Sequence, residues 1–111
     1  MSFYEKWSKA LLAKDIKAQI DCYHEDFEFV RHQSGTSMNK QEMSAMITGM
    51  YETGKLKIAS TRCIYENEDI LVEHMIVDFP DGTTESIIAA YMLKDGKIIR
   101  QETGATLVSK D

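Results

Sequence analysis

Three side chains of this 111-residue chain are suited to chemistry and lie in stretches of alternating polarity: Arg31, His74 and Tyr91. Successive side chains of a strand face opposite ways, so Arg31 shares a face with Phe27 and Phe29. A guanidinium on that face could hold a carbonyl or a carboxylate bidentately. The alternative is a solvated arginine at a strand end with an acidic partner, because arginine is usually exposed.

His74 lies in the middle of a predicted strand, on the same face as Val72, Ile76 and Asp78. In an apolar cavity, a neutral imidazole could act as a general base near neutral pH. The competing interpretation is a core or interface histidine that makes one hydrogen bond. Tyr91 belongs to another alternating stretch and could present a hydroxyl donor deep in the same cavity.

We expect no chemistry from two further carboxylates and the two cysteines. Glu85 is near a turn and should be exposed, since buried carboxylates are rare unless paired, and Glu102 should lie on an outer sheet face. Cys22 ends a helix, where the dipole opposes a thiolate, and Cys63 sits in a strand, so both should be inert buried thiols. The sequence contains neither HExxH nor CxxC, and we expect no metal and no cofactor.

The acidic composition narrows the range of partners. Thirteen Lys and Arg stand against 18 Asp and Glu, and the net charge of -5 repels phosphate backbones and anionic membranes. The longest apolar run, residues 87–93, is too short for a bilayer, which takes about 20 residues. The N-terminus lacks the pattern of a secretory signal. We therefore expect a cytoplasmic, single-domain protein (residues 1–111) that binds neither nucleic acid nor membrane.

The elements that must position these groups can be predicted from caps and turns. Ser2, Asp15 and Asn39 are placed as N-caps of three helices, and Gly54 is placed to end the third. A short strand over residues 27–32 and a polar loop over 33–37 precede the third helix. Turn residues then separate four strands, which predicts an antiparallel meander over residues 56–66, 70–79, 83–93 and 97–108.

Three segments carry a resemblance to a known superfamily: Ala10 to Ala18, Tyr23 to Phe29, and Lys94 to Ile99. They look like its helix-to-helix aspartate, its aromatic-x-x-Asp entry to the first strand, and its last hairpin. In order and spacing, from about Tyr4 to Thr103, the chain resembles the nuclear transport factor 2-like (NTF2-like) superfamily, which includes steroid delta-isomerase, scytalone dehydratase, limonene epoxide hydrolase and SnoaL-like polyketide cyclases. The resemblance implies an α+β, cone-shaped fold with three N-terminal helices on a curved, mainly antiparallel sheet.

The resemblance does not carry over the catalytic residues of steroid isomerases. Their general base is an aspartate on the first strand, and Arg31 stands at that position here. Their oxyanion hole uses a tyrosine and a protonated aspartate, where this chain has Trp7 and Ala89. No carboxylate, arginine, carboxylate relay of the hydrolases is found either. The alignment places the face of His74 toward the inside of the cone.

The function expected is binding of a small apolar or carboxylate-bearing molecule in an apolar, cone-shaped pocket, with isomerase, dehydratase or cyclase activity that would use His74, Arg31 and Tyr91. The alternative is a non-catalytic dimeric ligand-binding or protein-interaction module. The resemblance implies a homodimer through the outer sheet face, for which the interface candidates are Thr84, Ser86, Ile88, Ala90 and Met92. The predicted ligand-binding residues are Trp7, Phe27, Phe29, Arg31, Met46, Met50, His74, Ala89 and Tyr91.

Overall fold

The computed structural model describes residues 2–109, so the predicted domain limits, residues 1 and 111, lie outside the described part of the chain. It has an α+β arrangement of three helices and six strands. Along the chain these are α1 (Phe3–Leu12), α2 (Ile16–Asp21), β1 (Tyr23–Arg31), β2 (Thr36–Asn39), α3 (Lys40–Glu52), β3 (Lys57–Glu66), β4 (Ile70–Asp78), β5 (Thr84–Lys94) and β6 (Lys97–Leu107).

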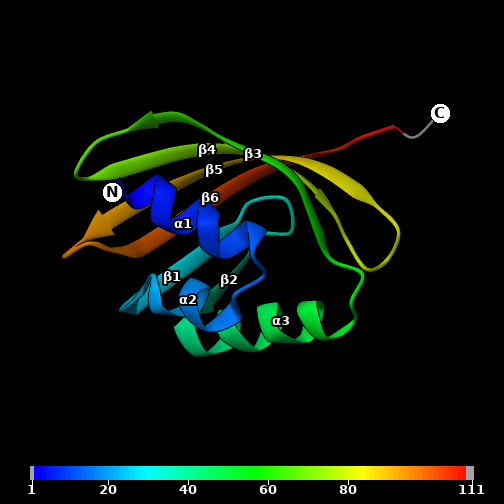
Figure 1. The fold of residues 1–111 in the computed structure, drawn as a ribbon, viewed down its shortest axis with the longest axis horizontal. Helices are drawn as coiled ribbons and strands as arrows, with labels where there is room; N and C mark the ends of the chain where they lie inside the picture. Colours follow the sequence, from blue (N-terminus) through cyan, green and yellow to red (C-terminus); the bar gives the residue numbers. More distant parts are fainter. Residues whose placement is uncertain (1, 110–111) are drawn as a thin grey trace.

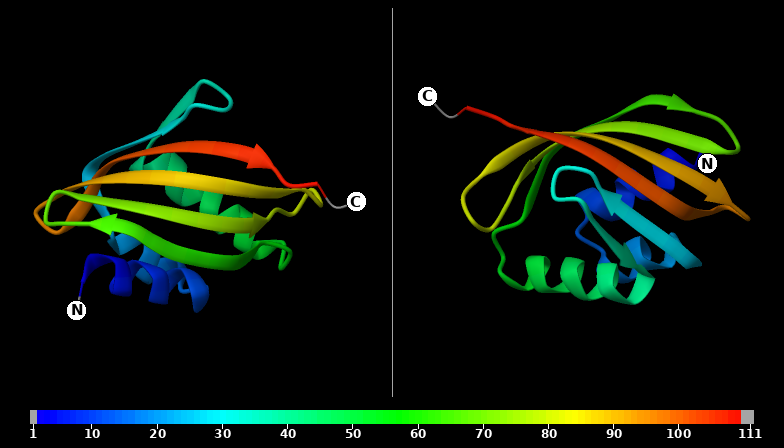
Figure 2. Two further views of the ribbon diagram at one scale, coloured as in Figure 1. Left: turned by 90° about the horizontal axis from the view of Figure 1, so that it is seen from above. Right: turned by 180° about the vertical axis from the view of Figure 1, so that it is seen from behind.

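All six strands form one mixed sheet in the order β2-β1-β6-β5-β4-β3. The strands β1 and β6 run parallel, and the other neighbours run antiparallel. The long strands β3 to β6 arch over one side of the molecule, and α3 lies on the opposite side with α1, α2 and β1 between them (Figure 1). The two further views show the same curvature of the sheet (Figure 2).

The predicted caps begin all three helices. The side chain of Ser2 accepts a hydrogen bond from the Glu5 backbone, and that of Asp15 accepts one from the backbone of α2. Asn39 and Glu42 form a reciprocal capping box at the start of α3. Because caps satisfy backbone N–H groups that have no partner within the helix, these short local signals were sufficient to locate the helices.

The predicted loop over residues 33–37 is wrong in part, because residues 36–39 form a sixth strand of the sheet. Strand β2 pairs antiparallel with the end of β1, with Thr36 opposite Arg31. It is a short edge strand whose side chains are mostly exposed, so it lacks the apolar alternation that marks a strand in sequence. Strand β1 also begins earlier than predicted, at Tyr23, because an irregularity before Glu28 interrupts its alternation.

On each central strand, every second side chain belongs to the inner face of the sheet. On β4 the buried residues are Leu71, Glu73, Met75 and Val77, so His74 points to the outer face. The prediction that His74 faces inward is therefore wrong. Both rows of β4 are rich in apolar residues, so alternation alone could not show which row is buried.

Aromatic side chains from α1, β1 and β5 pack together in the core. The ring of Trp7 on α1 lies edge-on to Tyr91, with centroids 5.4 Å apart, and to Tyr23 at 5.8 Å. The ring of Tyr23 is 4.3 Å from that of Phe27. These contacts pack α1 against β1 and β5. Within residues 2–109, no helix is long and apolar enough to cross a membrane.

Candidate functional site

A cavity of about 440 Å³ lies between α3 and the inner face of the sheet. This volume is within the range of small-molecule sites, roughly 300–1,000 Å³. All three helices, the turn after β4 and most strands contribute to its wall. The wall is mostly apolar and aromatic, and its polar lining residues are Gln19, Arg31, Asp81, Thr83, Glu85, Gln101 and Thr103.

The structure brings six of the nine predicted ligand-binding residues to this cavity: Trp7, Phe29, Arg31, Met46, Met50 and Tyr91. Their part in binding stays a prediction. The other three lie elsewhere. Phe27 is buried against Tyr23, Ala89 is buried under the wall, and His74 is on the opposite face of the sheet.

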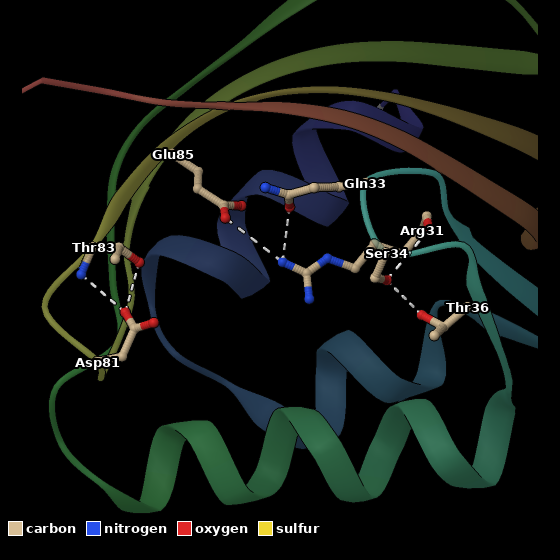
Figure 3. Close-up of polar contacts among 7 residues, drawn as sticks. All are labelled: Arg31, Gln33, Ser34, Thr36, Asp81, Thr83 and Glu85. Atoms are coloured by element: carbon tan, nitrogen blue, oxygen red, sulfur yellow. Dashed lines mark hydrogen bonds and ion pairs between the residues drawn. The ribbon is translucent and has the colours of Figure 1, made fainter.

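An ion pair joins two cavity residues from strands far apart in the sequence. The Nη2 atom of Arg31 is 3.6 Å from Oε2 of Glu85 and donates a hydrogen bond to Oε1 of Gln33 at 3.1 Å (Figure 3). The Arg31 side chain is 37% exposed and that of Glu85 is 8% exposed. Arg31 therefore lines the cavity, as one interpretation of the sequence predicted, and also has an acidic partner, as the other predicted.

The prediction that Glu85 is exposed is wrong, because its partner could not be identified from the sequence. Its carboxylate is buried in an otherwise largely apolar wall, and a guanidinium beside it offsets part of the cost of burial. The rim near this pair is ordered by a turn in which the backbone and hydroxyl of Thr83 donate to Asp81 (Figure 3). Arg31 and Glu85 come from strands that are far apart in sequence, so no local pattern could predict that they form a pair.

A second carboxyl, Glu73, is fully buried behind the aromatic wall of the cavity. Its Oε1 accepts hydrogen bonds from the indole N–H of Trp7 at 3.1 Å and the hydroxyl of Tyr91 at 2.6 Å. Its Oε2 forms a hydrogen bond with the hydroxyl of Thr61, which in turn is 3.2 Å from the hydroxyl of Tyr4. The Tyr91 hydroxyl, expected to point into the pocket as a donor, is therefore occupied by Glu73.

Burial raises the pKa of Glu73, although its hydrogen bonds to Thr61, Tyr91 and Trp7 act in the opposite direction. The hydroxyl of Thr61 donates to Oε2, so three neutral donors surround this carboxyl. Burial and the nearby Glu73 also raise the pKa of Tyr91 well above its ordinary value, which keeps its hydroxyl protonated.

Two polar atoms next to the cavity have no hydrogen-bond partner among residues 2–109: Oε1 of Gln101 and the hydroxyl of Tyr23. Burial raises the pKa of Tyr23, and a weaker side-chain interaction with Gln19 lowers it. The Oε1 atom of Gln19 accepts a hydrogen bond from the Tyr51 hydroxyl at 3.1 Å. A buried polar group without a partner costs about 1–3 kcal/mol. Sequence patterns offered no signal for either atom, because both depend on tertiary packing.

On the outer face, His74 is held by two neighbours. Its Nδ1 accepts a hydrogen bond from Nε of Arg62 at 3.3 Å, so its Nε2 carries the hydrogen and donates to Ser86 at 2.9 Å. Glu102 is on this face as predicted, bonded to His32 and Arg100. His74 therefore cannot reach a ligand in the cavity, and the structure removes it from the candidate catalytic residues.

The two cysteines differ in their exposure to solvent. Cys22 is buried, and burial raises the pKa of its thiol, whereas Cys63 is exposed rather than buried as expected. Cys63 lies on β3, the edge strand of the sheet, where one side has no neighbouring strand to cover it. Across residues 2–109, no three His, Cys, Asp or Glu side chains gather as a metal site would require.

No protein-family model and no curated protein matches this chain. Solved structures do match. An NTF2-like protein of unknown function from Cytophaga hutchinsonii aligns at a TM-score of 0.76 and 14% identity, over 94% of this chain and 87% of that one. A second such protein, from Burkholderia xenovorans, aligns at 0.75 and 17%, over 98% and 84%. TerC co-crystallised with polyporic acid aligns at 0.73 and 17%, over 94% and 88%. The chain therefore has the NTF2-like fold that the resemblance predicted.

The raised pKa of Glu73 predicts a stability that falls with rising pH. The unfolded chain releases this proton near pH 4.5 and the folded chain at a higher pH, so the stabilising contribution is complete below that value and is lost as pH rises through the folded pKa. In Glu73→Gln, which keeps the acceptor for Trp7 and Tyr91, this loss is absent. Relative to the variant, the wild-type unfolding free energy should fall as the pH rises from about 4 to 8. Urea unfolding followed by Trp7 fluorescence measures it, with the exposed Glu68→Gln as control; parallel pH profiles for wild type and Glu73→Gln would contradict the assignment.

Proposed function

We propose that this domain binds a small, largely apolar molecule in the cavity between α3 and the sheet. The observation that carries the proposal is the cavity of about 440 Å³, whose apolar and aromatic wall contains one charged pair, Arg31 and Glu85. Small-molecule sites have this composition, because apolar surface supplies affinity while a few polar groups fix the orientation of the ligand. The neighbour TerC, co-crystallised with polyporic acid, supports a small-molecule function for this fold.

The same pair supports acid–base chemistry of the isomerase, dehydratase or cyclase type. A carboxylate in the position of Glu85 can take a proton from a carbon next to a carbonyl group. The guanidinium of Arg31, 3.6 Å from it, can stabilise the negative charge that develops on the carbonyl oxygen. We assign Glu85 as the proton acceptor and Arg31 as the electrostatic stabiliser, in place of the steroid-isomerase set that this chain lacks.

Filling the cavity should abolish binding of an apolar probe. In Met46→Trp, the indole would occupy space beside the neighbouring wall residue Met50, so the Kd for N-phenyl-1-naphthylamine should rise by about tenfold or more. Dye fluorescence measures the affinity, and Gln41→Trp, an exposed residue of the same helix outside this cavity, should leave it unchanged. Equal affinities in both variants, or no binding to the wild type, would refute the proposed pocket.

Catalysis by Glu85 can be separated from binding with a simple ketone. In D₂O, the wild type should accelerate exchange of the α-protons of 2-tetralone, followed by NMR. Glu85→Gln should slow this exchange by about 100-fold, because a neutral amide cannot take the proton, and Arg31→Met should slow it less. His74→Gln, on the outer face, should exchange like the wild type. If the wild type binds 2-tetralone but does not accelerate exchange of its α-protons, the enzyme proposal is refuted and the non-catalytic binding module is supported.

The exposure of apolar residues on the outer face of the sheet supports the alternative function, a dimeric binding module. Ile88 on β5 is 45% exposed, and Ser86, Ala90 and Met92 are partly exposed in the same row. Thr84 is buried and donates a hydrogen bond to Asp78. A second copy of the chain would cover this apolar row, which is why we propose a homodimer through this face.

A charge at Ile88 should break such a dimer. A lysine there would be buried unpaired in the interface, which is strongly unfavourable. Light scattering after gel filtration should give a dimer mass for the wild type and a monomer mass for Ile88→Lys. Leu12→Lys, which charges an exposed apolar residue on α1, is the matched control and should remain dimeric. A monomeric wild type would exclude the interface.

A further inference from the structure

The guanidinium of Arg31 is the positively charged group among the described cavity residues, and its side chain is 37% exposed, so a molecule in the cavity can reach it. Within residues 2–109, its side-chain hydrogen bond runs from Nη2 to Gln33. The other terminal nitrogen points toward α3, away from both Gln33 and Glu85 (Figure 3). The N–H groups of Nη1 and Nε are therefore available to an acceptor on a ligand.

The positive charge of Arg31 is compensated within the wall. Oε2 of Glu85 is 3.6 Å from Nη2, and the Glu85 side chain is only 8% exposed, so little water separates the two charges from each other. Asp81 adds a second carboxylate at the rim, where it is exposed to solvent. The charged lining residues are thus one cation and two carboxylates, with no excess of positive charge to attract an anion.

Resting on the proposed small-molecule function, we propose that Glu85 determines the charge of the ligand: the cavity binds uncharged carbonyl compounds and rejects carboxylates of the same shape. Both kinds of ligand can accept a hydrogen bond from Arg31. A carboxylate, however, loses its hydration in a mostly apolar cavity, and repulsion from Glu85 cancels part of the attraction to Arg31 that would offset this loss. A neutral carbonyl oxygen costs far less to desolvate and still accepts the hydrogen bond.

Arg31 without Glu85 would favour the opposite ligand. A guanidinium in an apolar wall attracts carboxylates, which it can hold bidentately. Selectivity against carboxylates therefore comes from the repulsive neighbour and not from Arg31 itself. Glu85 needs no contact with the ligand for this effect, because its charge acts through space in surroundings from which most water is excluded.

The test compares 2-acetonaphthone with 2-naphthoate, which differ mainly by a methyl group in place of a negatively charged oxygen. At pH 7, calorimetry should show that the wild type binds the ketone about tenfold or more tighter than the carboxylate. Glu85→Gln keeps the shape of the side chain and removes its charge. In this variant, the Kd for 2-naphthoate should fall by about tenfold or more, while the Kd for the ketone changes by less than about threefold.

Two further variants separate the charge of Glu85 from a general effect of substitution. Glu68→Gln removes an exposed carboxylate outside this cavity and should keep the wild-type ratio of the two affinities. Arg31→Met removes the cation and leaves Glu85, so both probes should bind more weakly and the carboxylate should gain nothing. Continued binding of the ketone by Glu85→Gln shows that this variant retains the folded cavity.

The outcomes separate this proposal from the pocket on which it rests. A preference for the ketone in the wild type that is lost or reversed in Glu85→Gln, with the ketone still bound, supports it. If the wild type binds 2-naphthoate as tightly as 2-acetonaphthone, or if the preference persists in Glu85→Gln, the role of Glu85 is overturned and the small-molecule pocket stands. If neither probe binds to the wild type, both proposals fall.

Discussion

The buried carboxyl of Glu73 is the constraint on which the inner half of the molecule depends. A carboxyl removed from water must have its oxygens satisfied, and here the partners come from α1, β3 and β5 through Trp7, Thr61 and Tyr91. One group on β4 thereby ties the first helix to three adjacent strands. Loss of any partner would leave part of the carboxyl unsatisfied, so the position of α1 against the sheet is determined by hydrogen bonding as well as by apolar burial.

This arrangement also decides where cavity chemistry can take place. Trp7 and Tyr91 present their rings to the cavity but commit their polar hydrogens to Glu73, so the aromatic wall beside them supplies shape rather than donors. The charged side chains that line the cavity are Arg31, Asp81 and Glu85, and the guanidinium of Arg31 is the partner of Glu85. The two buried carboxyls of the inner face thus differ in role because their surroundings differ: neutral donors hold one in place, and a cation faces the other across the cavity wall.

Features that depend on interactions between residues near each other in sequence could be predicted, and features that depend on distant residues could not. Caps and turns act within a few residues, so the three helices and the four long strands were predicted to within a few residues, and the resemblance supplied the fold. The inner face of β4 depends on which of two adjacent residues, Glu73 or His74, is buried, and Glu73 is buried only because Trp7, Thr61 and Tyr91 satisfy it. Likewise, Glu85 is buried beside Arg31 on a strand that is distant in sequence. Sites assembled by tertiary contacts of this kind leave no local pattern.

The fold satisfies the polar groups of Glu73 and Gln101 to different extents. Both are polar residues on the inner face, on strands separated only by β5, and the fold satisfies one completely while it leaves an oxygen of the other without a donor. An apolar residue in place of Gln101 would avoid the cost of the unsatisfied amide oxygen, about 1–3 kcal/mol. A stability criterion alone therefore accounts for Glu73 with its three partners but not for Gln101.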